Sequence, residues 1–150
     1  MTLLSVKLEL VLVFSVLTFI NCEAGFERKT RVKLEGGSTP TFVLSGSGTL
    51  GNLLIYGPKQ RDVGTDRSFA LWEIEPKAGF LHGELLEKIR RIKYGVVPEG
   101  YRQVYPENNG VPPTLSTGER YEYWFQTVNG SHARSYFEIR DGQAVESQNQ

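Results

Sequence analysis

Short runs of alternating or continuous apolar residues recur through residues 40–142, and turn-forming residues bound each run. Such runs, edged by Gly, Pro and Asn, are typical of β-strands. Seven segments fit the pattern: TFVLS (41–45), NLLIY (52–56), SFALWEIE (68–75), RIKYGVV (91–97), YRQVY (101–105), ERYEYWFQTV (119–128) and SHARSYFEIR (131–140). The pattern predicts an all-β domain of about seven strands.

The segments between these runs favour antiparallel pairing. Asn129-Gly130 separates two alternating runs, which is the strongest short-range signal for a β-hairpin because both residues tolerate positive φ. Residues 83–91 could instead make two helical turns, supported by Glu87 and Arg91 four residues apart, although so short a helix needs packing. Without regularly spaced helices, a parallel α/β sheet is not expected.

A different apolar segment lies at the front of the chain, where residues 10–20 read LVLVFSVLTFI behind Lys7. A bilayer span needs about 20 apolar residues, so this run fits the central region of a secretory signal better. Glu9 beside the run departs from the usual purely basic start of such signals. We expect residues 1–22 to be a signal peptide and the protein to be exported, to a periplasmic or cell-envelope location.

Cys22 is the only cysteine and stands at the end of this region. A lone thiol in an exported protein must be free, paired between chains, or modified. The sequence FINC resembles the lipobox of bacterial lipoproteins, although Phe19 and Asn21 occupy positions where Leu and a small residue are usual. We therefore expect either lipidation of Cys22 or ordinary signal cleavage between Ala24 and Gly25.

Composition divides the rest of the chain. Residues 23–39 are charged, end near Gly-Gly-Ser and predict a tether with room for a short strand at RVKL. Residues 40–142 form the predicted domain, and residues 143–150 a polar tail. The 17 basic and 17 acidic residues are interspersed, which argues against binding to a nucleic-acid backbone.

Leu115, Gly118 and Tyr121 have a spacing that resembles the tyrosine corner of fibronectin type III and other immunoglobulin-like sandwiches. ALWEIEP (70–76) is similar to the tryptophan-containing early strand of that family. The resemblance implies an immunoglobulin-like sandwich, with the Tyr121 ring buried and its hydroxyl bonded to the backbone of residues 113–118. The chain is also similar to small bacterial secreted proteins or lipoproteins in two segments, IKYGVVPEGYRQVYP and LSTGERYEYWFQT. This similarity does not identify a functional site.

Candidate chemistry is sparse. Residues 46–51 (GSGTLG) match the glycine pattern of dinucleotide sites, but Gly57-Pro58 would end the helix that such a site requires, so a glycine turn is favoured. His82 and His132 lack Cys, Asp or Glu partners at zinc-ligand spacing. We expect no catalytic residues, no metal and no cofactor.

Aromatic residues give the remaining lead. Alternation places Tyr121, Tyr123 and Phe125 on one face of a strand and Trp124 on the other. Trp124 and Tyr136 could form an exposed surface for stacking or for a partner, although core packing with scattered surface aromatics is the commoner case.

The sequence favours a non-catalytic binding or structural module of the bacterial cell envelope. The alternative is a small carbohydrate- or cargo-binding domain that uses exposed aromatics. The partner would be an envelope protein or a glycan, and a lipid anchor would be the contact with the membrane.

Overall fold

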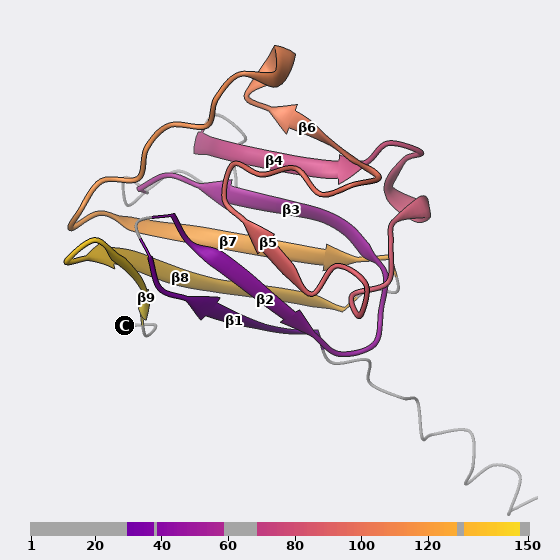
Figure 1. The fold of residues 1–150 in the computed structure, drawn as a ribbon, viewed down its shortest axis with the longest axis horizontal. Coiled ribbons are helices and arrows are strands. Elements are labelled where there is room, and N and C mark those ends of the chain that lie inside the picture. The colour runs from indigo at the N-terminus through magenta and orange to yellow at the C-terminus, as the bar shows by residue number, and fades with distance from the viewer. Residues whose placement is uncertain (1–29, 38, 59–68, 129–130, 148–150) are drawn as a thin grey trace, which may run out of the picture.

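Two antiparallel β-sheets stack against each other in the computed structural model, which describes residues 30–37, 39–58, 69–128 and 131–147 (Figure 1). The smaller sheet has the order β1-β2-β5 and the larger has the order β6-β4-β3-β7-β8-β9. The strands are β1 Arg31–Glu35, β2 Thr41–Ser45, β3 Leu50–Tyr56, β4 Ala70–Pro76, β5 Arg91–Lys93, β6 Tyr101–Tyr105, β7 Arg120–Thr127, β8 His132–Arg140 and β9 Gln143–Ser147. The described residues also contain the 3₁₀ turns η2 Phe80–His82 and η3 Glu107–Asn109. The prediction of an all-β sandwich is confirmed.

Nine strands occur in the described residues, where the sequence predicted about seven. All seven predicted runs contain a strand, and the two additions are β1 in the expected tether and β9 in the expected polar tail. They support each other, because the Leu34 N–H donates to Glu146 Oε1 at 3.4 Å and the Ala144 N–H donates to the Gly37 carbonyl at 3.2 Å. Few of their side chains are buried, so their sequences look polar although their backbones are paired.

The division into three and six strands also differs from the four and three of an immunoglobulin constant domain. In Figure 1 the smaller sheet lies over β3, β7 and β8, whereas the loop between β5 and β6 crosses the sheet nearer β4. The larger sheet is thus only partly covered by a second layer of strands.

Residues 83–90, a possible short helix by sequence, form turns instead. Their backbone groups bond to the start of β3 and to the residues just before it: the Leu50 N–H donates to the Glu84 carbonyl at 2.9 Å, and the Leu86 N–H donates to the Gly48 carbonyl at 2.9 Å. Leu86 is fully buried by this docking. Since these groups are committed to β3, they are not available for an intrahelical ladder.

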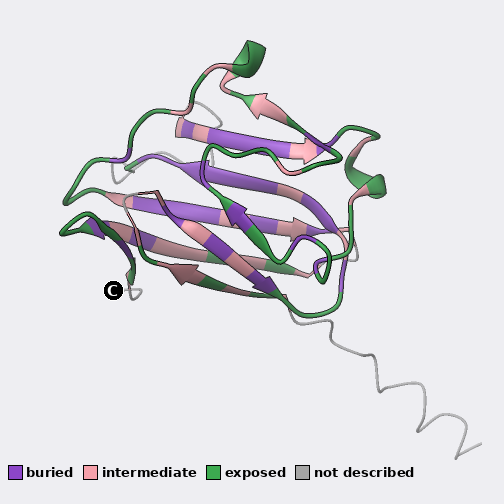
Figure 2. Cartoon of the chain, in the orientation of Figure 1, coloured by how far each residue is buried: buried purple, intermediate pink, exposed green. Residues whose placement is uncertain are grey.

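The core fills the space between the sheets (Figure 2). Phe42 of β2 inserts among rings of β7 and β8, with centroids 5.4 Å from Tyr123, 5.5 Å from Phe125 and 6.1 Å from Phe137. Each contact is edge-to-face, the arrangement that the ring quadrupole favours. The aromatic side of β7 that alternation singled out therefore faces inward.

The β7–β8 pairing confirms the predicted hairpin, although its turn residues 129–130 lie outside the described residues. The Thr127 N–H donates to the Ser131 carbonyl at 3.0 Å, so three residues separate the paired ends instead of two. This register sets Phe137 opposite Tyr121, inside the core. A register shifted by one residue would turn Phe137 outward.

Candidate functional site

Trp124 and Tyr136 lie on the outward face of the six-stranded sheet, in a patch of cross-strand pairs. Three pairs stand directly opposite one another on β7 and β8: Arg120 with Glu138, Glu122 with Tyr136, and Trp124 with Arg134. We call these six residues the outer ladder. The structure thus brings together the two aromatic residues that the sequence singled out and adds four charged neighbours.

Diagonal contacts hold the outer ladder together. The guanidinium carbon of Arg120 lies 4.3 Å from the ring centroid of Tyr136, a cation–π contact. The Nε–H of Arg134 donates to Oε1 of Glu122, one step away on the neighbouring strand. Diagonal neighbours across antiparallel strands are within reach of such long side chains. One face of the Tyr136 ring is therefore occupied by a cation.

Charge and burial are unequal across this ladder. The Glu122 side chain is only 2 % exposed, whereas that of Arg134 is 41 % exposed. A buried carboxylate is costly unless it is paired, and Arg134 provides a pair. In return, the hydrogen bond to Glu122 raises the pKa of Arg134. Hydrogen bonds from Arg140 and then Ser147 lower the pKa of Glu138 at the exposed side.

Trp124 is less open than alternation alone suggested. It packs against a second apolar cluster on the outward face, which contains Leu54, Tyr56 and Ala70 and also Phe69. Its indole N–H is buried and has no hydrogen-bond partner in the described part of the chain. The accessible portion of the ladder consequently lies toward β8.

The tyrosine corner residues meet at the edge of the core. Leu115 and Tyr121 are buried, and the Tyr121 hydroxyl accepts a hydrogen bond from the Ser116 N–H at 2.7 Å. Gly118 takes φ +83° and donates its N–H to the Ile139 carbonyl at 2.8 Å. The ring and hydroxyl of Tyr121 thus lie as the corner spacing predicts.

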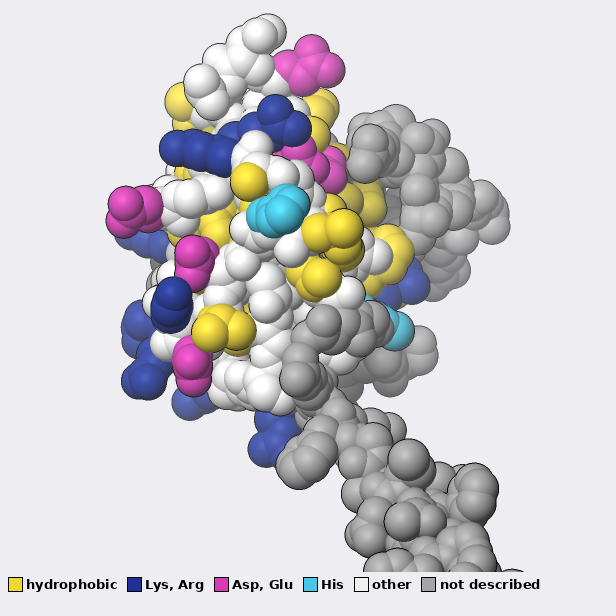
Figure 3. Space-filling model, turned by 90° about the vertical axis from the view of Figure 1, so that its right-hand side faces the viewer, with side chains coloured by type: hydrophobic (Ala, Val, Ile, Leu, Met, Phe, Trp, Pro, Cys, Tyr) yellow, Lys and Arg dark blue, Asp and Glu magenta, His cyan; other side chains and the backbone are white. Residues whose placement is uncertain are grey.

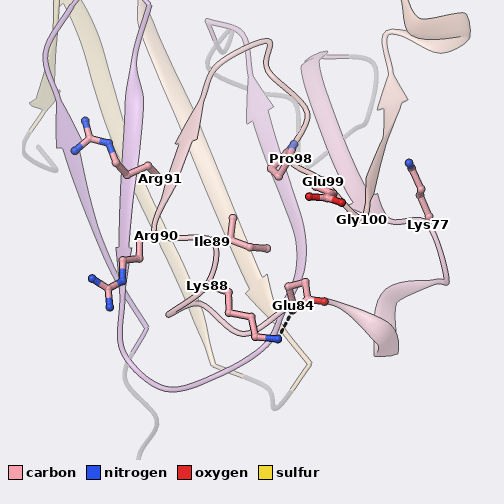
Figure 4. Close-up of a pocket in the computed structure, with 9 residues that line it drawn as sticks. All are labelled: Lys77, Glu84, Lys88, Ile89, Arg90, Arg91, Pro98, Glu99 and Gly100. Carbon is pink, nitrogen blue, oxygen red and sulfur yellow. Dashed lines mark hydrogen bonds and ion pairs between the residues drawn. The ribbon is translucent and has the colours of Figure 1, made fainter.

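A groove of about 920 Å³ that sequence reasoning missed opens between the turns after η2 and the loop before β6 (Figure 4). Its lining residues are Lys77, Glu84, Lys88, Ile89, Arg90, Arg91, Pro98, Glu99 and Gly100. Lys88 and Glu84 form an ion pair at 3.2 Å, and Figure 4 shows the guanidinium groups of Arg90 and Arg91 pointing away from Pro98. The charges do not converge on one point, so the groove is no built site for a small anion.

The remaining sequence motifs are the glycine-rich segment, the two histidines and Cys22. Gly51 lies inside β3, and a Cβ there would overlap the ring of Phe80. The absence of a side chain at Gly51 therefore makes room for the Phe80 ring. The residues after Gly51 continue β3, so no helix follows the glycine motif. His82 lies in η2 and His132 begins β8, both exposed. No group of three His, Cys, Asp or Glu that could hold a metal occurs among the described residues. Cys22 is outside them.

Over the ranges that the structure describes, no helix is long and apolar enough to cross a membrane. No protein-family model, curated protein or solved structure matches this chain. Its own geometry is thus the basis for a proposed function.

Proposed function

We propose that this protein is an exported, non-catalytic module of the bacterial cell envelope that binds a protein partner through the outer ladder. A lipid on Cys22 holds it at a membrane in this proposal. The observation that carries the binding role is the packing of Trp124, Tyr136, Arg120 and Arg134 on one outward face. The anchoring role rests on the lone thiol directly behind the apolar run at residues 10–20.

The residue types of the outer ladder favour a protein partner. Trp, Tyr and Arg dominate the energetically important positions of protein interfaces, because they combine large contact area with hydrogen bonding. Both signs of charge occur side by side, with Arg120 opposite Glu138 and Arg134 bonded to Glu122. A partner surface with complementary charges would fit the outer ladder in one alignment. Charge as well as contact area would therefore select the partner.

The same contacts disfavour the carbohydrate alternative. Stacking on a sugar needs an open ring face, but Arg120 covers one face of Tyr136. Trp124 is half-buried against Leu54 and Tyr56. Catalysis is disfavoured as well, because Glu122 is bonded to Arg134 and Glu138 to Arg140.

At the level of family, we propose that the sandwich is of the fibronectin type III-like, immunoglobulin-like kind. The bond from the Ser116 N–H to the Tyr121 hydroxyl supports this, since such a corner occurs in that group. The chain ends add β1 to the smaller sheet and β9 to the larger one, and the two and five strands that remain are divided differently from the four and three of a constant domain.

A quantitative capture experiment tests the binding role. Envelope proteins retained by the wild-type chain are compared with those retained by Tyr136→Ala and by Val111→Ser, a control at a 90 % exposed position away from the ladder. We expect Tyr136→Ala to lose retention by about tenfold, equivalent to about 1.4 kcal/mol, and Val111→Ser to lose none. Equal retention by both variants, with melting temperatures close to wild type, would overturn the proposal. Retention that survives protease digestion of the extract would favour the carbohydrate alternative.

Anchoring is tested separately by the intact mass of the mature N-terminus and by fractionation of Cys22→Ala. Lipidated Cys22 in the membrane fraction, and release of the variant, are the expected results. A wild-type chain that begins at Gly25 and fractionates as soluble would contradict anchoring and leave the binding test unaffected.

A further inference from the structure

The start of the described chain lies at one defined end of the sandwich. The hydroxyl oxygens of Thr30 and Ser131 are hydrogen-bonded at 2.8 Å. Beside them the Val128 N–H donates to the Thr49 carbonyl at 3.0 Å, and Thr49 forms an isolated β-bridge with Leu85. These contacts link the chain start, the β7–β8 connection and the turns after η2. We call this region the Thr30 end.

The Thr30 end carries exposed apolar side chains. Leu81 is 69 % exposed, Leu85 42 % and Phe80 38 %. The Phe80 ring packs over Gly51, two residues from the Thr49 that bridges to Leu85, so the three side chains leave the same part of the molecule. Figure 3 views this end and shows hydrophobic side chains gathered around an exposed histidine, with basic and acidic side chains nearby.

The segment that presents these side chains is held firmly. The Tyr101 hydroxyl donates to the Leu50 carbonyl at 2.8 Å and accepts from the Glu84 N–H at 3.0 Å. Gly83 approaches the Leu50 carbonyl so closely that a Cβ there would overlap it. The apolar side chains therefore project from an ordered support and need no rearrangement to meet a surface.

We propose that Phe80, Leu81 and Leu85 insert into the headgroup region of a phospholipid bilayer. The inference rests on the proposed anchoring at Cys22. Thr30 is eight residues after Cys22, which corresponds to at most about 26 Å at roughly 3.3 Å per residue, so a lipid on Cys22 keeps the Thr30 end near the bilayer. Amphipathic surfaces of this type lie at the boundary between headgroups and acyl chains.

Charge near the cluster agrees with an anionic bilayer. The groove beside the cluster is lined by four Lys or Arg residues and two Glu residues. Of the basic residues, Lys77 and Arg90 form no ion pair within the described ranges of the chain. Each basic residue near an anionic membrane surface contributes to binding, and together they would orient the Thr30 end toward it.

The test places a polarity-sensitive dye on Leu81→Cys of the full chain and, in a matched sample, on Val111→Cys in the segment that leads to β7. β7 begins at Arg120, at the opposite end from Val128, so the control reports the far side. The lipidated chain is reconstituted in vesicles of phosphatidylglycerol and phosphatidylethanolamine with brominated acyl chains. We expect a blue shift and severalfold stronger quenching at position 81 than at position 111.

Equal quenching at the two positions would overturn the proposal, as would a blue shift at position 81 that needs no vesicles and grows with protein concentration. The second result would show self-association instead.

If mass spectrometry finds Cys22 unmodified, the anchoring proposal fails on its own. The dyes are then placed in the Cys22→Ala chain and vesicles are titrated: quenching confined to position 81 still supports docking, and its absence overturns docking. The double variant Leu81→Ser, Leu85→Ser should weaken vesicle binding severalfold without dye.

Discussion

The Tyr121 hydroxyl lies 2.7 Å from the Ser116 backbone nitrogen, across the turn that leads into β7. The ring is buried and stacks on Phe137 at a centroid distance of 5.3 Å. One hydrogen bond thus ties the loop before β7 to the edge of the core.

Tyr121→Phe should lower the free energy of unfolding by about 0.5–1.5 kcal/mol, the net value of one hydrogen bond. Ser116 is exposed, so water can satisfy its N–H in the variant and keeps the cost in this range. Tyr105→Phe is the matched control, because Tyr105 is 40 % exposed and its hydroxyl bonds to nothing in the described part of the chain. Urea denaturation of both variants gives the comparison. Equal stability of the two would remove the corner as a stabilising feature.

Gly118→Val should destabilise by about 1–2 kcal/mol through backbone strain alone. Gly118 has φ +83°, and a Cβ at this position would meet no atom within 4 Å. Gly118→Asn should cost less, since asparagine tolerates the left-handed region. The order Gly, Asn, Val in unfolding free energy is the expected result, and an equal cost for Asn and Val would contradict strain as the cause.

Substitutions at two glycines of the Thr30 end distinguish a clash with the backbone from a clash with a side chain. At Gly83 an added Cβ overlaps the Leu50 carbonyl, whereas at Gly51 it overlaps the Phe80 ring, which can swing aside. Gly83→Ala should therefore destabilise by about 1–3 kcal/mol, and Gly51→Ala should destabilise less while loosening η2. Denaturation curves give the energies. Faster amide hydrogen exchange at residues 80–84 in Gly51→Ala reports the loosening, and unchanged exchange would count against the packing of Phe80 on Gly51.

Stability should fall with rising pH above about 10. Burial raises the pKa of Tyr101 to about 12 from its ordinary 10.0, and burial also raises the pKa values of Tyr94 and Tyr123. The unfolded chain loses these protons first, so stability is unaffected below pH 10 and declines as pH rises toward 12. The slope is at most about 1.4 kcal/mol per pH unit for each tyrosine. Tyr101→Phe should flatten this decline, and an unchanged slope in that variant would exclude Tyr101 as a contributor.

Some of the fold could be predicted because the order of apolar and polar residues within one strand shows which side chains face the core. Alternation along β7 put Tyr121, Tyr123 and Phe125 on one face and Trp124 on the other, since successive side chains of a strand point to opposite sides. The edge strands β1 and β9 leave a weaker record. In β1, Val32 and Leu34 are only partly buried and the other three residues are charged. In β9, Ala144 is the one buried position, and the other residues are Gln, Val, Glu and Ser.

Sheet order and site contacts depend on information that no single strand carries. The outer ladder requires Arg120 to reach Tyr136, and this follows from a register in which three residues connect the paired ends of β7 and β8. The Asn-Gly pair favours a two-residue turn, which would have produced another set of neighbours. The packing of Trp124 on Leu54 likewise depends on β3 lying next to β7.

Photo-crosslinking in intact cells tests the outer ladder as a contact surface most directly. Benzoylphenylalanine replaces Tyr136 in one chain and Val111, 90 % exposed, in another. The account predicts a discrete protein adduct from position 136 and none from position 111. The adduct disappears when Arg134→Gln is added, a change that removes the charge and keeps an N–H donor for Glu122. Adducts of equal yield from both positions, or none from position 136 in a folded and exported chain, would contradict it.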